Sequence, residues 1–223
     1  MDVTARPSVV VFDYGSGNLR SAQRALERAG ASVTVASDPA VAADADGLVL
    51  PGVGAFAACM AGIEATGAGE VVAARVRGHR PVLGICVGLQ VLFDHGDEHG
   101  TVTKGLGLLP GAVQRLEAAR VPHMGWNTVQ APPSSRLFAS VAPTERFYFV
   151  HSYAARPSAA LTGAGALVTV SDHGGEFVAA VEAGALWATQ FHPEKSGAAG
   201  ADVLRNWVGS LLPTGSRGQE RWR

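Results

Sequence analysis

The stretch PVLGICVGLQVLF, residues Pro81 to Phe93, joins an apolar run, a cysteine between two glycines and a second apolar run. The continuous hydrophobicity of Pro81–Ile85 predicts a strand that is buried on both faces of a parallel sheet. Leu89–Phe93 predicts the start of a helix, so Gly84-Ile85-Cys86-Val87-Gly88 falls where a strand gives way to a helix. A G-x-nucleophile-x-G turn needs this context. The stretch therefore indicates an α/β fold and raises the question of what Cys86 does.

The same alternation of strands and helices runs through the rest of the first half of the chain. Short apolar runs predict strands at residues 9–12, 33–35 and 47–50. Helical periodicity covers residues 19–29 and 55–77, with a break near Gly67. This βαβ order predicts a doubly wound parallel sheet with right-handed crossovers.

The second half of the chain is richer in strands. Strand-like segments follow one another at residues 128–130, 147–150, 167–170, 176–181 and 186–191. Turn signals at His173–Gly175 and Glu182–Gly184 predict hairpins, so we expect an antiparallel extension of the parallel sheet. Residues 198–212 predict a closing helix. Because no linker divides the chain, we expect one domain over residues 1–214 and a polar C-terminal tail at residues 215–223.

Length, charge and cysteine content exclude several classes of function. A chain of 223 residues suits one large domain, and its formal net charge of −1 offers no field for nucleic acid or an anionic membrane. We expect neither a signal peptide nor a membrane span, because no apolar stretch reaches about 18 residues. Two cysteines outside any CxxC pair favour a reduced, cytoplasmic setting. We expect no metal or cofactor, because the acidic and histidine residues at positions 94–99 match no ligand spacing and read as a polar loop.

Three roles are open to Cys86 from the residues alone: a packed core thiol, a metal or redox ligand, or a nucleophile. The flanking glycines leave room at a tight turn, and a helix N-terminus beyond it favours a thiolate. A nucleophile also needs a base and a group that orients the base. His192 ends an apolar strand, and Glu194, two residues along an extended segment, can accept the second N–H of its imidazole. Because Cys86 and His192 both end strands of one α/β sheet, we predict that they meet at its carboxyl edge.

Two further glycine-rich loops carry weaker signals. Residues 52–57 imitate a dinucleotide-binding fingerprint, but Pro51 precedes them and no acidic residue follows a suitable next strand. A turn that exposes backbone N–H groups is the better interpretation. The loop at residues 13–18 lacks the Gly-Lys-Ser/Thr ending of a P-loop, and Cys59 lies in a helical apolar run that predicts a core position.

Several motifs in a fixed order resemble a known family. GICVGLQ and QFHPEKS resemble the class I glutamine amidotransferases, and FDYGSGNLRS, LPGVGAF, PHMGWN, FYFVHSY and ATQFHPEKSG resemble the glutaminase subunits of imidazole glycerol phosphate synthase. The resemblance runs from Val9 to Leu212. It implies the three-layer, flavodoxin-like α/β fold of that class, with a parallel central sheet and an antiparallel extension.

The resemblance also implies a role for each site residue. Cys86 would attack the side-chain amide carbon of L-glutamine, His192 would transfer the proton, and Glu194 would hold the imidazole. The oxyanion would be held by backbone N–H groups, namely those of Val87 and of the turn that contains Gly52 and Val53. The glutamine site maps onto Gly54, Gln90, Glu98, Ser152 and Tyr153. The loop around Glu98 can be aligned one residue differently.

A partner is implied in the same way. The family's glutaminase forms a heterodimer with a (β/α)8-barrel cyclase subunit, which uses the ammonia to make imidazole glycerol phosphate in histidine biosynthesis. Candidates for the interface are Asn18, His123, Trp126, Asn127 and Lys195, with ordinary edge packing an equal alternative for Trp126. Two alternatives stay open: an amidotransferase subunit of the anthranilate or aminodeoxychorismate type, and a non-catalytic α/β interaction module.

Overall fold

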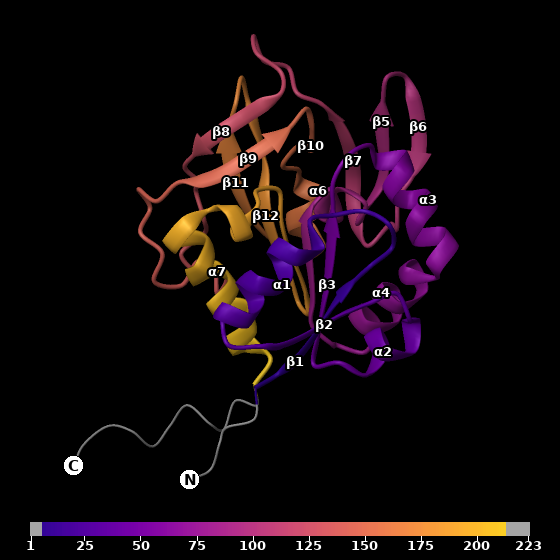
Figure 1. The fold of residues 1–223 in the computed structure, drawn as a ribbon. Helices are drawn as coiled ribbons and strands as arrows, with labels where there is room; N and C mark the ends of the chain where they lie inside the picture. Colours follow the sequence, from indigo (N-terminus) through magenta and orange to yellow (C-terminus); the bar gives the residue numbers. More distant parts are fainter. Residues whose placement is uncertain (1–5, 213–223) are drawn as a thin grey trace, which may run out of the picture.

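A computed structural model describes residues 6–212 and shows a central sheet between two layers of helices (Figure 1). The polar tail expected at residues 215–223 lies outside the described residues. The first half of the chain alternates as predicted, through β1 (Ser8–Phe12), α1 (Leu19–Arg28), β2 (Ser32–Ala36), α2 (Pro39–Asp44), β3 (Gly47–Gly52), α3 (Phe56–Thr66), α4 (Ala68–Arg77), β4 (Val82–Cys86) and α5 (Val87–Gln90).

The second half is made mostly of strands. It contains β5 (Phe93–Glu98), β6 (Thr101–Lys104), β7 (Leu109–Arg115), β8 (His123–Asn127), β9 (Phe147–His151), β10 (Tyr153–Ala155), α6 (Ala159–Gly163), β11 (Leu167–Asp172), β12 (Glu176–Ala183), β13 (Leu186–Thr189), the 3-10 turn η1 (Pro193–Lys195) and α7 (Gly197–Ser210). The hairpin turns predicted between the last three strands are confirmed.

The central sheet of the described chain has seven strands in the order β11-β12-β13-β4-β3-β1-β2. The strands from β13 to β2 are parallel to one another, whereas β12 and β11 add an antiparallel edge. Every residue of β3 and β4 is buried, as continuous apolar runs predict for central parallel strands. The predicted fold class, an α/β sheet with an antiparallel extension, is confirmed.

Helices cover both faces of this sheet. Figure 1 shows α1 beside α7 on one side, and α2, α3 and α4 on the other. The predicted break between α3 and α4 occurs at Gly67, whose φ of +71° is readily available to glycine. No single helix within residues 6–212 is long and apolar enough to cross a membrane; α3 and α4 meet that test only as a pair bent by 83°.

Two smaller sheets lie outside the central one and correct the sequence-based prediction. Strands β10, β7, β5 and β6 form one of them, and β8 pairs with β9 in the other, so residues 147–150 do not extend the central sheet. Residues 94–98 belong to β5 rather than to a polar loop. The strand expected at residues 128–130 is reduced to one bridge between Gln130 and Val170.

The helix predicted to start at Leu89 is also wrong in extent. The helical turn α5 ends at Gln90, and Phe93 already begins β5. The carbonyl groups of Val91 and Leu92 accept N–H groups from Leu106 and Leu108 at 2.8 Å each. Since these carbonyls bond to a distant segment, they are not available to continue a helix.

A buried arginine ties α2 to the sheet. The side chain of Arg75 is only 2 % exposed, and its guanidinium donates to five backbone carbonyls over 2.8–3.1 Å, those of Ala42, Ala43, Ala45, Asp46 and Pro81. Burial lowers the pKa of Arg75 to about 10. The carbonyl oxygens at the end of α2 therefore act as the acceptors for this cation in place of a carboxylate.

Candidate active site

Cys86 occupies a sharp turn at the end of β4, the predicted strand-to-helix junction. Its φ of +57° is rare for a residue with a side chain, and it lies between a strand and the one-turn helix α5. A Cβ atom at Gly88 would lie 1.9 Å from the carbonyl oxygen of Leu50, so only glycine fits there. The turn therefore has the geometry of a nucleophile elbow.

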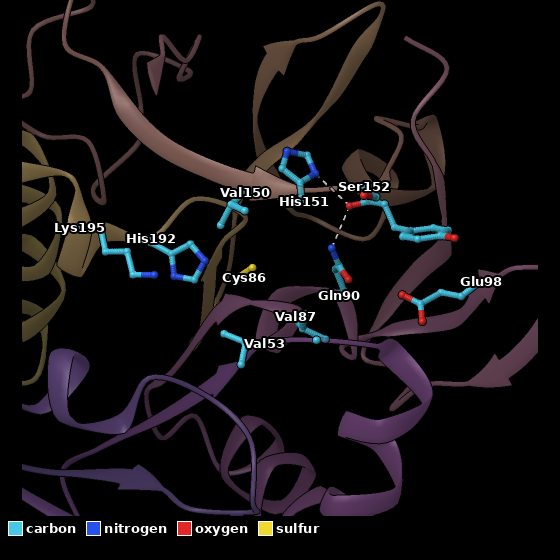
Figure 2. Close-up of a pocket in the computed structure, with 12 residues that line it drawn as sticks. Val53, Cys86, Val87, Gln90, Glu98, Val150, His151, Ser152, His192 and Lys195 are labelled. Atoms are coloured by element: carbon cyan, nitrogen blue, oxygen red, sulfur yellow. Dashed lines mark hydrogen bonds between the residues drawn. The ribbon is translucent and has the colours of Figure 1, made fainter. Parts of the chain in front are cut away.

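The order of the strands brings the other site residues to the same edge. Strand β4 lies between β3 and β13, with Gly52 opposite Cys86 and Thr189 opposite Ile85. The chain that leaves β13 continues to His192, and Figure 2 shows the Cys86 sulfur facing the His192 imidazole. The predicted meeting of Cys86 and His192 at the carboxyl edge of the sheet agrees with this arrangement.

His192 and Glu194 form a buried pair. The Nδ1 atom of His192 lies 2.8 Å from Oε1 of Glu194, and both side chains are 3 % exposed. The backbone route differs from the extended segment expected, because residues 193–195 form the 3-10 turn η1, closed by a 3.0 Å bond from the Lys195 N–H to the His192 carbonyl. Since Nδ1 donates to the carboxylate, Nε2 is the atom left for Cys86.

Charge on the His192 ring is favoured in spite of burial. Burial alone would lower its pKa, but the interactions with Cys86 and Glu194 outweigh that effect and raise the pKa of His192 to about 9. Its Nε2 atom is buried and makes no hydrogen bond within the described part of the chain. The imidazole is thus positioned to hold a proton near the sulfur without being committed to another partner.

A cavity of about 200 Å³ opens beside Cys86. Its lining includes His192 and every residue predicted to bind glutamine, namely Gly54, Gln90, Glu98, Ser152 and Tyr153. These residues come from four separate parts of the chain, and Figure 2 shows Gln90 and Glu98 along the side of the cavity away from His192. In the same view, Cys86 lies between His192 on one side and Gln90 and Glu98 on the other.

The predicted oxyanion donors are arranged differently from expectation at one position. The backbone N–H of Val53 donates to Oγ of Ser16 at 3.1 Å, and the Val53 carbonyl accepts from the same hydroxyl at 2.8 Å. Cys59, buried as predicted, also contacts this carbonyl at 3.4 Å. The Val53 amide is therefore not free to hold an oxyanion in this arrangement, whereas Val87 begins α5 directly after Cys86. The role of Ser16 could not be inferred from its loop sequence alone.

Comparison with known proteins places this geometry in a family. The family model described as glutamine amidotransferase class-I matches residues 10–210. The chain belongs to the class I glutamine amidotransferases. The amidotransferase is 59 % identical to imidazole glycerol phosphate synthase subunit HisH of Thermobifida fusca, over 92 % of this chain and 100 % of the relative. It is 57 % identical to the HisH subunit of Corynebacterium glutamicum, over 90 % of this chain and 97 % of the relative.

Solved structures of lower identity share the fold. A putative GMP synthase protein of Thermoplasma acidophilum has a TM-score of 0.69 at 21 % identity and covers 92 % of this chain and 94 % of its own. A structure described as a glutamine amidotransferase has the same TM-score at 19 % identity, covering 91 % of this chain and 97 % of its own. The three-layer fold of the amidotransferase is therefore the fold of the wider class.

Polar contacts hold two of the side chains that are predicted to bind glutamine. Oε2 of Glu98 accepts the N–H of Phe56 at 2.9 Å, so this carboxylate lies at the N-terminus of α3, where negative charge is favoured. Nε2 of Gln90 donates to the Tyr153 carbonyl at 2.9 Å. Figure 2 shows the Gln90 amide nitrogen pointing to this carbonyl oxygen.

The predicted interface residues differ in their exposure. Alternate side chains of β8 point to opposite faces, so Met124 and Trp126 are 63 % and 53 % exposed while His123 is 5 % exposed. The His123 side chain is therefore buried within the chain itself, and its place at an interface stays a prediction. Asn127 is half-buried and donates to the Asp172 carbonyl at 2.9 Å. The exposed candidates are Asn18, Trp126 and Lys195.

His123 instead belongs to a buried pair of neutral rings. Nδ1 of His151 faces the Tyr153 carbonyl at 3.0 Å, and a carbonyl only accepts, so this nitrogen carries the proton. Nε2 of His151 then accepts from Nδ1 of His123 at 3.0 Å. Burial lowers the pKa of His151 to about 3 and that of His123 to about 4, so both rings are neutral at neutral pH.

Proposed function

We propose that the chain hydrolyses L-glutamine to glutamate and ammonia, with Cys86 as the nucleophile. The observation that carries the proposal is the line of Cys86, His192 and Glu194 along one edge of the sheet, beside a cavity lined by polar groups. The chain's relatives at 55–59 % identity are HisH subunits of imidazole glycerol phosphate synthase, which supports the same reaction here.

The chemistry starts from a thiolate and an imidazolium. The sulfur of Cys86 attacks the amide carbon of the glutamine side chain, and a C–S bond forms as the carbonyl oxygen becomes an oxyanion. His192 then gives its Nε2 proton to the amine, the C–N bond breaks, and ammonia leaves a γ-glutamyl thioester. Water, deprotonated by His192, attacks this thioester and releases glutamate, and Cys86 is again a thiolate beside the imidazolium. Glu194 keeps the ring oriented through both steps.

The oxyanion needs donors that point at the developing charge. The N–H of Val87, at the start of α5, is well placed by its position in the chain next to Cys86. The turn of Gly52 and Val53 would supply a second donor only after the Val53 amide leaves Ser16.

The size and polarity of the cavity suit an amino acid. Its volume of about 200 Å³ is below the roughly 300–1,000 Å³ of clefts that hold drug-sized ligands. Glu98 would pair with the ammonium group of the substrate, and Gln90 would accept a hydrogen bond from it through Oε1. Gly54, Ser152 and Tyr153 would complete the glutamine site.

We infer that the ammonia passes to a cyclase subunit that makes imidazole glycerol phosphate in histidine biosynthesis. The HisH relatives are subunits of the synthase by name, and β8 exposes Met124 and Trp126. The partner would be a (β/α)8-barrel in a heterodimer, with Asn18, Trp126, Asn127 and Lys195 at or near the contact. We further propose that residues 1–214 form one domain and that the protein works in the cytoplasm.

The test is glutamine hydrolysis by the full chain, alone and with a (β/α)8-barrel cyclase subunit of imidazole glycerol phosphate synthase and its nucleotide ligand. Glutamate release should rise on addition of that partner and disappear in Cys86→Ala, while partner binding survives the substitution. Stimulation only by a chorismate-using partner would favour the anthranilate or aminodeoxychorismate type. Unchanged glutamate release from Cys86→Ala would refute the assignment of the nucleophile.

A further inference from the structure

Gln190 is a fully buried amide that the catalytic residues do not account for. It lies between β13 and His192, is 0 % exposed, and is held in the sheet by a 2.8 Å bond from its backbone N–H to the Ala179 carbonyl. Its side-chain Nε2 lies 3.8 Å from Sγ of Cys86, within reach of a long N–H···S hydrogen bond. In sequence it looks like the end of an apolar strand, and nothing there indicates a contact with the cysteine.

The neighbouring groups determine which end of the amide faces the sulfur. The Tyr153 carbonyl has lone pairs only, so the group of Gln90 that lies 2.9 Å from it is the NH₂. The same NH₂ lies 3.0 Å from the Gln190 side chain, which must present its oxygen there. The remaining end of the Gln190 amide, the one beside Cys86, is therefore the donor. A flipped Gln190 would place two NH₂ groups against each other.

The Tyr153 carbonyl that anchors this chain of bonds is held from a second side. His151 donates to it at 3.0 Å, and Figure 2 shows the bonds from His151 and Gln90 converging on the same oxygen. Both lone pairs of that oxygen are thus occupied, so the Gln90 amide has one orientation and Gln190 has one in turn.

We propose that Gln190 is a positioning residue for the nucleophile: its side-chain N–H donates to Sγ of Cys86, favours the thiolate over the thiol, and holds the sulfur in place. Hydrogen bonds to a charged acceptor are stronger than those to a neutral one, so the donor stabilises the ionised sulfur selectively. The sulfur then lies between an imidazolium and an amide N–H. This proposal rests on the proposed function, because it assigns Cys86 the role of nucleophile.

The test measures the ionisation of Cys86 directly, without glutamine. Iodoacetamide labelling of Cys86 in the full chain is followed by peptide mass spectrometry between about pH 5 and pH 10, so labelling of Cys59 is counted separately. In Gln190→Met, which keeps the volume but removes the donor, the pH midpoint of labelling should rise and labelling near pH 7 should slow roughly tenfold, the effect of losing one hydrogen bond to a charged group.

Two further variants keep the result interpretable. Gln190→Asn retains a buried amide but shortens it by one methylene, so it should fold even if the methionine variant does not, and it should show the same upward shift. Thr189→Val is the matched control, since its buried hydroxyl donates to the Phe191 carbonyl at 3.0 Å and does not face the sulfur; its labelling profile should not move.

The two proposals fail separately. An unshifted labelling profile in folded Gln190→Asn or Gln190→Met would overturn the role of Gln190, even if the natural chain hydrolyses glutamine. If the Gln190 variants shift the labelling profile but the natural chain does not hydrolyse glutamine, the role of Gln190 stands and the proposed function is refuted. A shift of equal size in Thr189→Val would show a general packing effect and would also overturn the proposal.

Discussion

Acid should destabilise the protein through the neutral pair of His123 and His151. Burial lowers their pKa values to about 4 and about 3, below the ordinary 6.5. Between those values the unfolded chain binds protons that the folded protein does not, so this part of the stability is complete above pH 6.5 and is lost as the pH falls. Protonation of His151 would also set two N–H donors against each other across the 3.0 Å contact with His123.

The size of the effect follows from these pKa values. At pH 5, about 1.5 units below the pKa of an unfolded histidine, each ring should lower the free energy of unfolding by about 2 kcal/mol. The pair should therefore lower it by about 4 kcal/mol. His192 acts in the opposite direction, because its raised pKa of about 9 means that the folded protein binds the extra proton. From about pH 8 to pH 5, His192 should raise the free energy of unfolding by about 2 kcal/mol. Together with the loss from the histidine pair, the natural chain should become less stable by only about 2 kcal/mol.

Urea unfolding at the two pH values separates these contributions. The double variant His123→Phe/His151→Gln cannot take up the two protons, so it should be about 2 kcal/mol more stable near pH 5 than near pH 8. His79→Asn removes an exposed histidine and should behave as the natural chain. If the double variant lost as much stability in acid as the natural chain, the buried pair would not be the cause.

Three other substitutions test the fold and the site. Arg75→Met leaves five carbonyls without their donor and should lower the urea-unfolding free energy by about 4 kcal/mol; a loss below about 1 kcal/mol would contradict the bonding described. Gly88→Ala should abolish soluble, cooperatively melting protein, whereas Gly209→Ala, with no atom within 4 Å of the added carbon, should melt like the natural chain. The rate of glutamine hydrolysis should fall above about pH 9, because His192 loses its proton there. Glu194→Gln should shift this alkaline decline to lower pH. An unshifted decline would show that Glu194 does not contribute to the raised pKa of His192.

The parallel part of the fold could be predicted because its strands are buried on both faces. Such strands must be apolar at every position, so β1, β3 and β4 are visible as continuous runs. Cys86 ends β4, and His192 follows β13, a buried strand that is parallel to β4. Parallel strands end at one edge of a sheet. The meeting of the two residues therefore follows from strand order alone.

The smaller sheets could not be predicted because their strands depend on distant partners. Strand β5 carries Asp94, His95 and Asp97, a composition typical of a loop, and it is a strand only because β6 and β7 pair with it. The expectation of an extended link from His192 to Glu194 was wrong for a similar reason. Proline at the start of a short helical turn has a suitable φ, and the turn brings the carboxylate to the same nitrogen.

Buried polar contacts were the least visible from the sequence. Ser16 and Gln190 each lie in segments whose pattern indicates an ordinary loop or an apolar strand. Their partners, the Val53 amide and the Cys86 sulfur, are 37 and 104 residues away. Side-chain hydrogen bonds over such separations exist only once the sheet has assembled, so no local pattern encodes them.

The two halves of the active site lie far apart in the chain, and this separation affects the order of events during synthesis. Cys86 ends β4, while His192 follows β13. Strand β13 pairs with β4 but is synthesised about a hundred residues later. On the mechanism proposed above, a nascent chain that has released only its first half from the ribosome would hold the nucleophile without its base, so it would not consume glutamine. Closure of a ladder with so large a sequence separation comes late in folding. On the same mechanism, ammonia production would begin only once β13 has paired with β4.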